Sequence, residues 1–439
     1  MASDQPIRLG MLGFGTVGQA VARALQQRAH EITTRTGRAI VLHRVAVRDP
    51  ARPRRVGLDG VYVHRSPLEV VEQPDVDLLV EVMGGEEPAA SAIRRALELG
   101  KPVVTANKVV MARRGPELLG LARRQGVPLM FEAAVGGAVP IIRPIQESLA
   151  SDRILALLGI VNGTTNFILT EMTDQGVAFE AALQEAQRRG YAEADPSADV
   201  SGLDAACKLS VLASLAFDRW VPVERLDVRG LDGITARDVQ YAGELGLVVK
   251  LLAFSRLLDG AIEAWVGPAM VPRRHPLAQV RGVNNAIWLV TEAAGELMFY
   301  GPGAGGDPTA AAVLGDVMDV VRRHAPRAYS DRGNGSWSVA HADWEPARMV
   351  EPGGALARFY LRLQVLDRPG VLAAIADVFG RHGVSIESVI QKGRGEDPVD
   401  LVFVTHEASL AAVQGVAAQV RELPVVVWTG PLVRVVGGA

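Results

Sequence analysis

A glycine-rich turn near the amino terminus constrains the fold more than any other part of the chain. It follows an apolar run at residues 7–12, opens an amphipathic stretch at residues 17–27, and consists of Gly13, Phe14, Gly15, Thr16, Val17 and Gly18. In a strand, turn and helix of this pattern, the first glycine allows the tight turn and the second lets the backbone approach a pyrophosphate. The third lets the helix pack closely on the strand. The turn therefore predicts a dinucleotide-binding loop, and the alternative is a glycine-rich turn that holds no ligand.

The surrounding pattern predicts a parallel sheet. Short apolar runs alternate with helical patterns, with strands expected at residues 7–12, 41–47, 76–82, 102–105 and 127–131 and helices at 17–27, 88–99 and 116–124. Nearly continuous apolar strands separated by helices are typical of an α/β sheet covered on both faces. We expect a Rossmann-type dinucleotide-binding domain over residues 1–131, completed by a helical pattern within residues 306–325.

The rest of the chain predicts two further domains and a linker. Residues 132–305 combine a helix at 140–150, strands at 154–161, 261–266 and 286–291, and long helical stretches, which indicates an α+β substrate and dimerisation domain. A glycine-rich loop at 301–306 precedes a helix at 308–324. Residues 326–356 are rich in Arg, Gly, Pro, Ser and Asn and predict a linker. Residues 357–437 follow a βαββαβ order, which predicts a ferredoxin-like domain.

Composition excludes several classes of protein. The 46 basic and 49 acidic residues are interspersed and give a net charge of −3, so no basic face is expected for nucleic acid or an anionic membrane. A single cysteine excludes a disulfide framework and a cysteine-based metal cluster. With no signal peptide and no apolar membrane span in the sequence, we expect a cytoplasmic protein.

The end of the second predicted strand bears on the choice of cofactor. An acid there binds the ribose hydroxyl of NAD, whereas an arginine accommodates the 2′-phosphate of NADP. Both residue types are present, as Arg48 and Asp49, and Arg52, Arg54 and Arg55 follow. Arg48 and the arginines after it favour NADP, although a solvated charged loop is the alternative.

Two lysines are candidates for chemistry. Lys108 follows Thr105 just beyond the carboxyl end of the fourth strand, where open α/β sheets bind ligands. Lys208 follows Asp204 by four residues, so the two share one face of a helical stretch that is otherwise almost wholly apolar. Charges in such a helix are costly unless they are paired, and they often mark functional sites.

Carboxylates upstream of this pair suit an amino-acid substrate. Glu193 and Asp199 together with Asp204 give three acids near one amine. Carboxylates bind an α-ammonium group and a hydroxyl, and a lysine can move the hydroxyl proton as an alcohol becomes a carbonyl. Either Lys208 or Lys108 could carry that proton.

Two loops complete the candidate site. Residues 162–166 end a strand and begin a helix, so that their N–H groups could bind a carboxylate. Residues 132–140 lie at a predicted domain junction, where backbone carbonyls could hold a hard cation, and a plain hinge is the alternative.

Taken together, these segments resemble homoserine dehydrogenase over residues 7–325. The family signature is matched at Ala186, Gly190, Tyr191, Ala192, Asp195, Pro196, Asp199, Val200, Gly202, Asp204 and Lys208, with no departure. The segments 81–85, 105–108, 162–166 and 301–309 also match family motifs. No aspartokinase-like segment precedes the first strand, so we do not expect the bifunctional kinase–dehydrogenase form.

The resemblance implies a reaction and a set of site residues. The family interconverts L-homoserine and L-aspartate 4-semialdehyde reversibly with NAD(P), in threonine, methionine and isoleucine biosynthesis, and is typically dimeric. The implied catalytic residues are Lys208 and Lys108. The substrate pocket corresponds to Glu193, Asp199, Asp204, Tyr191, Gly163 and Thr164. The implied cofactor site adds Arg48, Gly84, Thr105, Lys108, Gly303 and Gly306 to the glycine turn, and a monovalent cation such as sodium corresponds to Glu132, Val135, Gly137 and Val139.

The carboxyl-terminal unit resembles an ACT domain. The resemblance is carried by residues 359–361, by the turn at Asp367–Leu372, and by residues 383–386. Such domains commonly bind an amino acid at this turn, and the resemblance implies threonine as the effector. A unit that serves only oligomerisation is the alternative.

Two other functions remain open from the sequence. Another amino-acid dehydrogenase of this fold would differ in its products, because a deaminating enzyme releases ammonia. A non-catalytic amino-acid sensor could use the nucleotide only structurally, but it would have no need of two lysines and three carboxylates.

Overall fold

The structure is a computed structural model that describes residues 5–324, 344–351, 353–392 and 398–437. Contacts divide it into two units. The first unit contains residues 1–154, 210–224 and 291–347, and the second contains residues 155–209, 225–290 and 348–439. Each unit is described by itself.

The first unit is built on a six-stranded sheet of order β3-β2-β1-β4-β5-β6, in which every neighbouring pair is parallel. This is the Rossmann-type arrangement that the alternating pattern predicts. Its strands are β1 (Ile7–Leu12), β2 (Ile40–Ala46), β3 (Tyr62–His64), β4 (Leu78–Glu81), β5 (Val103–Thr105) and β6 (Leu129–Met130).

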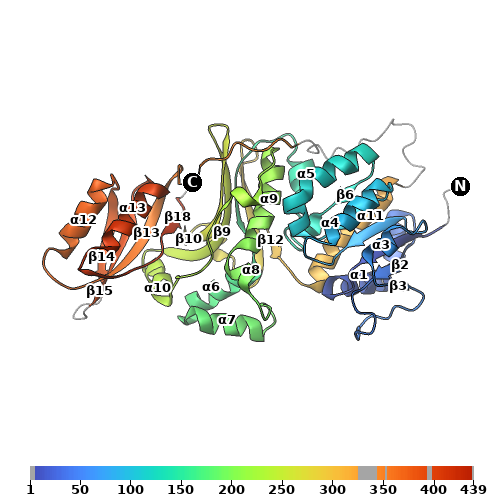
Figure 1. Cartoon of the computed structure of the whole chain (residues 1–439), viewed down its shortest axis with the longest axis horizontal. Coiled ribbons are helices and arrows are strands. Elements are labelled where there is room, and N and C mark those ends of the chain that lie inside the picture. The colour runs from blue at the N-terminus through green and yellow to red at the C-terminus, as the bar shows by residue number, and fades with distance from the viewer. Residues whose placement is uncertain (1–4, 325–343, 352, 393–397, 438–439) are drawn as a thin grey trace. The chain divides into compact units, whose positions relative to one another are not determined.

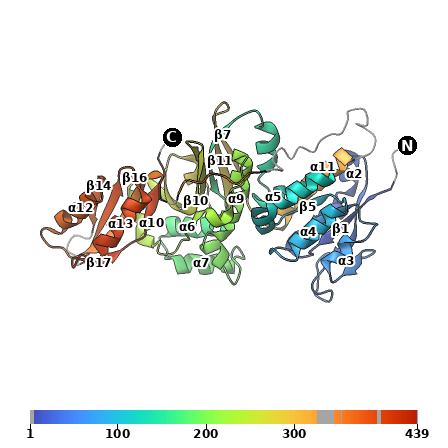
Figure 2. The same cartoon turned by 45° about the horizontal axis from the view of Figure 1, so that its top comes forward.

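Helices cover both faces of this sheet (Figures 1 and 2). The helices of the unit are α1 (Thr16–Gln27), α2 (Ala29–Thr36), α3 (Pro67–Val71), α4 (Ala89–Glu98), α5 (Lys108–Gln125) and α11 (Gly306–His324), with short turns η1 (Glu132–Ala134) and η2 (Pro144–Ser148). Strand β12 (Glu296–Pro302) precedes α11. The last four residues of β1 are all buried, as expected for a strand covered on both faces, and Leu9 and Met11 enter a core shared with α1 and α11.

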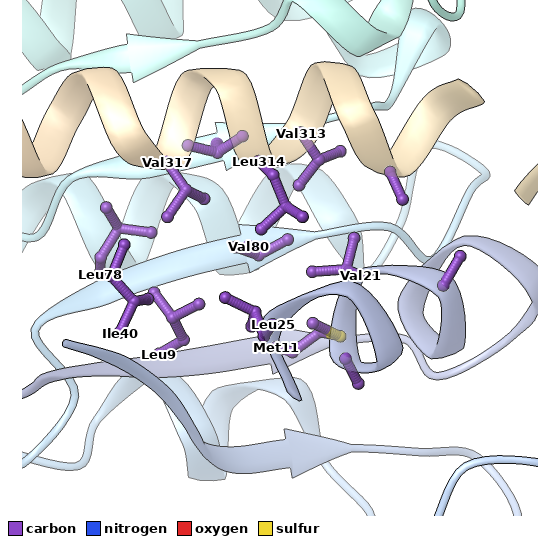
Figure 3. Close-up of a cluster of buried hydrophobic side chains, with 14 of the residues drawn as sticks. Leu9, Met11, Val21, Leu25, Ile40, Leu78, Val80, Val313, Leu314 and Val317 are labelled. Carbon is purple, nitrogen blue, oxygen red and sulfur yellow. The ribbon is translucent and has the colours of Figure 1, made fainter. Parts of the chain in front are cut away.

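Figure 3 shows this core, in which Val313, Leu314 and Val317 of α11 lie over Leu9, Leu78 and Val80 of the sheet. The helix predicted at residues 308–324 therefore returns to complete the first unit, and it begins 176 residues after the end of β6. Each of these side chains is at most 5% exposed, and full burial of such a residue contributes roughly 1.5–3 kcal/mol.

The second unit contains a mixed sheet of order β11-β7-β9-β10-β18-β13-β15-β14. The strands in its first part are β7 (Ile154–Ile160), β8 (Asp227–Val228), β9 (Leu247–Leu258), β10 (Ala261–Pro272) and β11 (Asn284–Thr291). The helices are α6 (Gly163–Gln175), α7 (Phe179–Arg188), α8 (Ser197–Val200), α9 (Leu203–Phe217) and α10 (Ala236–Glu244), with short turns η3 (Val223–Arg225) and η4 (Pro276–Gln279). The last residues of α9, from Ser210 on, belong to the first unit.

The carboxyl-terminal part has the predicted βαββαβ order. Its elements are β13 (Leu356–Val365), α12 (Val371–Arg381), β14 (Ile386–Lys392), β15 (Val399–Thr405), β16 (Ala408–Ser409), α13 (Leu410–Arg421), β17 (Val426–Thr429) and β18 (Val433–Val435). Inward-facing residues of β13 and β15, such as Phe359, Leu361 and Phe403, form a core with α12 and α13. The ferredoxin-like prediction is confirmed, and β16 and β18 were not predicted.

Three further predictions need correction. The helix expected at residues 116–124 begins at Lys108, because Asn107 caps it and Pro116 is tolerated in its interior. The helix expected at 140–150 is only the short π-helical turn η2. Strand β9 was not predicted at all. In the linker predicted at residues 326–356, positions up to 343 and residue 352 lie outside the described residues.

Candidate active site

The glycine turn has the geometry that its three roles require. A Cβ atom on Gly13, whose φ is +96°, would lie 2.8 Å from the carbonyl oxygen of Val82, and one on Gly18 would lie 2.5 Å from that of Gly13. At Gly15, by contrast, no heavy atom lies within 4 Å of the Cβ position. Gly15 is the N-cap of α1 and leaves open backbone at the helix start, which suits a phosphate. Phe14, Thr16 and Val17 complete the turn.

The predicted glycine-rich loop lies beside this turn. A Cβ atom on Gly306 would lie 3.2 Å from Cγ2 of Thr16. On the other side of the loop, the carbonyl oxygen of Gly303 would lie 2.4 Å from a Cβ atom on Gly137. The structure thus brings residues 303–306 next to the turn, as the cofactor prediction requires.

The arginines after β2 differ in what they contact. Arg48 is exposed at the end of the strand. Arg54 donates to the carbonyl oxygens of Asp49, Pro50 and Arg52 at 2.6–2.9 Å and so braces the loop on itself. Arg48 is therefore better placed than Arg54 to reach a 2′-phosphate.

Lys108 is the first residue of α5, directly after the cap residue Asn107. The Asn107 side chain accepts from the N–H of Val110 at 3.2 Å and donates to the carbonyl oxygen of Gly85 at 2.7 Å. Thr105 is fully buried at the end of β5, and Gly84 lies in the loop after β4 with a φ of +78°. These cofactor candidates thus share one edge of the sheet, at the carboxyl ends of β4 and β5.

Lys208 and Asp204 form the predicted ion pair inside the second unit. The Lys208 ammonium donates to Oδ2 of Asp204 at 2.8 Å and to the carbonyl oxygen of Val161 at 2.7 Å. Lys208 is 9% exposed and Asp204 is 6% exposed. At this burial the pair is not a surface ion pair, and the geometry supplies the partners that a buried charge needs.

Asn162 joins this pair to a second acid, Asp199. Its amide nitrogen donates to Oδ1 of Asp199 at 2.7 Å and to Oδ2 of Asp204 at 2.9 Å. Its amide oxygen accepts from the N–H of Thr165 at 2.9 Å and thereby caps α6. One side chain thus holds two carboxylates beside the amino-terminal end of a helix.

The other pocket candidates are placed around the start of α6. A Cβ atom on Gly163 would lie 2.7 Å from the carbonyl oxygen of Val283, so that only glycine fits there. The Thr164 hydroxyl donates to the carbonyl oxygen of Tyr191 at 2.8 Å. Glu193 is exposed, in the loop between α7 and α8.

In the predicted cation loop, the carboxylate of Glu132 already has hydrogen-bond donors, whereas three backbone carbonyls have no backbone N–H donor among the described residues. The Glu132 carboxylate accepts from the N–H groups of Ile141, Ile142 and Arg143 at 2.7–3.0 Å, which occupies most of its capacity. No backbone N–H of the described residues donates to the carbonyls of Val135, Gly137 or Val139. These carbonyls fit a hard cation. Elsewhere in the described residues, no group of three or more His, Cys, Asp or Glu side chains could hold a metal ion.

Asn162, Asn166, Lys250 and Glu81 were not predicted as site residues. The Lys250 ammonium contacts Oδ1 of Asn166 at 2.9 Å and the carbonyl oxygen of Val280 at 2.5 Å, and Glu81 is fully buried beneath Thr105. Asn162 and Asn166 lie in a motif that was noted, and an Asn between a strand and a helix is a capping signal. Nothing local in the sequence marks their partners, which lie up to 118 residues away.

Three family models match successive stretches of the chain. A model described as the homoserine dehydrogenase NAD-binding domain matches residues 13–132, and one described as homoserine dehydrogenase matches residues 140–318. An ACT domain model matches residues 359–424.

Relatives extend the match over nearly the whole chain. A homoserine dehydrogenase from Synechocystis is 39% identical over 433 residues, which is 98% of this chain and 99% of the relative. The chain belongs to the homoserine dehydrogenase family. A family member from Bacillus subtilis is 39% identical over 422 residues and 96% of both chains.

Solved structures of the family agree. A homoserine dehydrogenase from Thiobacillus denitrificans has a TM-score of 0.92 at 39% identity and covers 99% of both chains. A hyperthermophilic archaeal homoserine dehydrogenase in complex with NADPH has a TM-score of 0.62 at 29% identity, covering 73% of this chain and 98% of that one. As an oxidoreductase of this family, the chain carries a nucleotide-binding domain and an ACT domain. None of its described helices is long and apolar enough to cross a membrane.

Proposed function

We propose that this protein interconverts L-homoserine and L-aspartate 4-semialdehyde with NADP in preference to NAD. Membership of the homoserine dehydrogenase family supports the reaction. The observation that carries the proposal is the buried Lys208–Asp204 pair, which Asn162 ties to Asp199.

Lys208 is suited to moving a proton to or from the substrate oxygen. An ammonium group has three N–H bonds, and two of them are directed at Asp204 and Val161. The third can donate to the carbonyl oxygen of the semialdehyde during reduction. In the reverse direction the neutral amine takes the hydroxyl proton, and Asp204 stabilises the cation that forms.

The groups around this pair suit the two charges of an amino acid. Asp199, with Glu193 from the neighbouring loop, offers carboxylates for the α-ammonium group. The first turn of α6, with Gly163 and Thr164, offers a helix amino terminus for the α-carboxylate. Tyr191 lies against this turn, because its ring packs on Phe167 with centroids 5.1 Å apart.

For the cofactor we propose the turn Gly13–Gly18 with Gly84, Thr105, Lys108, Gly303 and Gly306. When bound, NADP supplies the acceptor or donor of the hydride. The open backbone at Gly15 and the start of α1 bind the phosphates, and exposed Arg48 pairs with the 2′-phosphate.

The remaining proposals follow from the family. A monovalent cation such as sodium is held mainly by the carbonyls of Val135, Gly137 and Val139, with Glu132 fixing the loop. The protein assembles as a homodimer or a larger homo-oligomer. Threonine binds the ACT domain near Asp367–Gly370 and lowers the activity.

The test is an assay of NADPH oxidation by the purified protein with aspartate semialdehyde, repeated with NADH, for the wild type and Lys208→Ala. We expect turnover that favours NADPH in the wild type and a loss of at least 1000-fold in the variant. NADPH affinity should be unchanged in Lys208→Ala, because Lys208 belongs to the substrate site.

Other results would point elsewhere. Release of ammonia would indicate a deaminating dehydrogenase. NADPH binding without turnover of the wild type would indicate a sensor. Near-normal turnover by Lys208→Ala would remove that residue from the mechanism.

A further inference from the structure

Glu81 is a buried carboxylate at the place where a doubly wound sheet binds its nucleotide. It ends β4, next to Leu12 of β1 on one side and Thr105 of β5 on the other. The strand order reverses between β1 and β4, and ligands bind at such a switch point, beyond the carboxyl ends of the strands. Glu81 is 0% exposed, so its carboxylate lies buried within the protein at this edge of the sheet.

Its two carboxylate oxygens accept hydrogen bonds from the loop that follows β4 and from the end of β5. Oε1 accepts from the N–H of Met83 at 2.7 Å, and Oε2 accepts from the Thr105 hydroxyl at 2.6 Å. The Thr105 hydroxyl oxygen in turn accepts from the N–H of Asn107 at 3.0 Å.

Asn107 closes the network. Its side chain donates to the carbonyl oxygen of Gly85 in the first loop and caps α5, whose first residue is Lys108. Hydrogen bonds therefore run from Glu81 through both loops to the backbone that carries Lys108.

A carboxylate is an expensive choice for this position. Burial raises the pKa of Glu81, and the groups that donate to it among the described residues are neutral N–H and hydroxyl groups. A buried, unpaired acid destabilises a fold, so its presence at a nucleotide-binding edge points to function.

We propose that Glu81 is a positioning residue, which through Thr105 and Asn107 sets the loop 83–85 and the start of α5 for cofactor binding and for Lys108. This inference rests on the proposed dehydrogenase function. It adds Glu81 to the residues that the reaction depends on, although the Glu81 side chain need not contact the substrate.

The test compares Glu81→Leu, which keeps the size and removes both hydrogen bonds, with Glu81→Gln, whose amide can accept from Met83 and donate to Thr105. The readouts are the NADPH dissociation constant by fluorescence titration without substrate, and kcat and KM for homoserine. We expect Glu81→Leu to lower kcat about 100-fold, as loss of alignment by about 1 Å does in other enzymes. NADPH binding should weaken about tenfold and the homoserine KM should stay within threefold, and Glu81→Gln should recover most of both losses.

Two further variants separate positioning from stability. Asp75→Asn removes a carboxylate from the loop between α3 and β4, where it pairs with Arg44 of β2 at 2.6 Å. It should lower the melting temperature without changing kcat or NADPH affinity. Thr105→Val removes the hydroxyl that donates to Glu81. It should reproduce much of the loss of kcat and NADPH affinity expected for Glu81→Leu. If Glu81→Leu does not fold, Thr105→Val takes its place in the test.

Wild-type kcat and NADPH affinity in Glu81→Leu, or in Thr105→Val if Glu81→Leu does not fold, would overturn the proposal. So would losses in Glu81→Gln as large as those in Glu81→Leu. If the wild type does not turn over homoserine, the proposed function fails, but the NADPH titration still tests Glu81.

Discussion

Lys250 on β9 carries a buried charge whose hydrogen-bond acceptors among the described residues are neutral. It is 2% exposed, and the acceptors around its ammonium are the Asn166 amide oxygen and the Val280 carbonyl oxygen. Burial lowers its pKa from 10.5 to about 8. Asn166 also donates to the carbonyls of Val280, Gly282 and Asn284, so Lys250 helps to hold the loop that closes over Gly163.

This pKa predicts how stability depends on pH. Between about pH 8 and 10.5 the folded amine is neutral while the unfolded lysine is still protonated, so the unfolded state binds one more proton. The free energy of unfolding should therefore rise with pH in that window, by up to about 1.4 kcal/mol per pH unit. Below pH 8 both states are charged and the contribution of this residue is constant.

Urea denaturation of the wild type and Lys250→Met from pH 7 to 10 measures the effect. Other groups titrate alike in both proteins, so the stability of the wild type relative to Lys250→Met should increase above about pH 8. A constant difference across the range would show that Lys250 has an ordinary pKa.

Cofactor choice gives a second prediction for a single residue. In Arg48→Asp a carboxylate repels a 2′-phosphate and can accept from a 2′-hydroxyl, so the ratio of kcat/KM for NADPH over NADH should fall at least tenfold. Arg52→Asp is the matched control, because Arg52 is also exposed and lies further along the loop. An unchanged ratio in Arg48→Asp would place the discriminating residue elsewhere, at Arg55 for example.

The sequence predicts residue pairs better than residue networks. The Asp204–Lys208 contact follows from a spacing of four on one helix. Asn162 binds acids 37 and 42 residues away, and only the folded chain brings these together. The same holds for Glu81 and Thr105, which lie on neighbouring strands 24 residues apart.

Among the elements that the sequence did not predict, β18 matters most, because it joins two parts of the sheet in the second unit. Three residues, Val433–Val435, gave too short a pattern for a strand, yet they pair with β10 on one side and β13 on the other (Figure 1). An element with a long pattern, α11, was expected at residues 308–324 and was predicted within two residues at each end. Strand β9 escaped because a run of apolar residues has no period that separates a strand from a buried helix.

Removal of β18 should destabilise the second unit. In a chain that ends at Gly430, burial of Val433 and Val435 is lost, at about 1.5 kcal/mol each. The Arg434–Asp227 ion pair at 3.0 Å is lost with them. We expect the free energy of unfolding to fall by about 3 kcal/mol in urea, whereas Val427→Ala at an exposed position of β17 should change it by less than about 0.5 kcal/mol. A truncated protein as stable as the full chain would show that the β18 pairing contributes little.

At the scale of the whole molecule, the ACT domain is joined to its neighbour by more than a linker. Arg362 of β13 is 3% exposed and donates to Oδ1 of Asp238 on α10 at 2.8 Å, and to Asp400 of β15 at 3.2 Å. Tyr360 also donates to Asp238, at 3.0 Å. The sheet face of the ACT domain that its own helices leave uncovered thus contacts α10 through buried charges, which the sequence pattern did not reveal.

This contact predicts the route by which an effector acts. A ligand on the ACT domain changes activity only if it binds one arrangement of the molecule more tightly than another, and a coupling of about 1–3 kcal/mol suffices. We expect the Arg362–Asp238 contact to be one of the bonds that differ between the arrangements. Deletion from Gly354 onward would also remove β18, so a point variant tests the route more cleanly.

The experiment measures threonine inhibition of the wild type and of Arg362→Met combined with Asp238→Asn. The double change removes both charges of the Arg362–Asp238 pair, and Asp400 keeps its ion pair with Arg237 at 3.1 Å. No buried charge is then left unpaired, which alone costs about 3–5 kcal/mol. Uninhibited kcat should stay within about threefold, because neither Arg362 nor Asp238 is among the residues proposed for the active site. Half-inhibition should need at least ten times more threonine. Arg381→Met, which removes an arginine paired with Asp377 on the exposed face of α12, should leave the response unchanged. If threonine inhibits the double variant as strongly as the wild type, the Arg362–Asp238 contact is not the route. If threonine does not inhibit the wild type, the effector of the ACT domain is another amino acid.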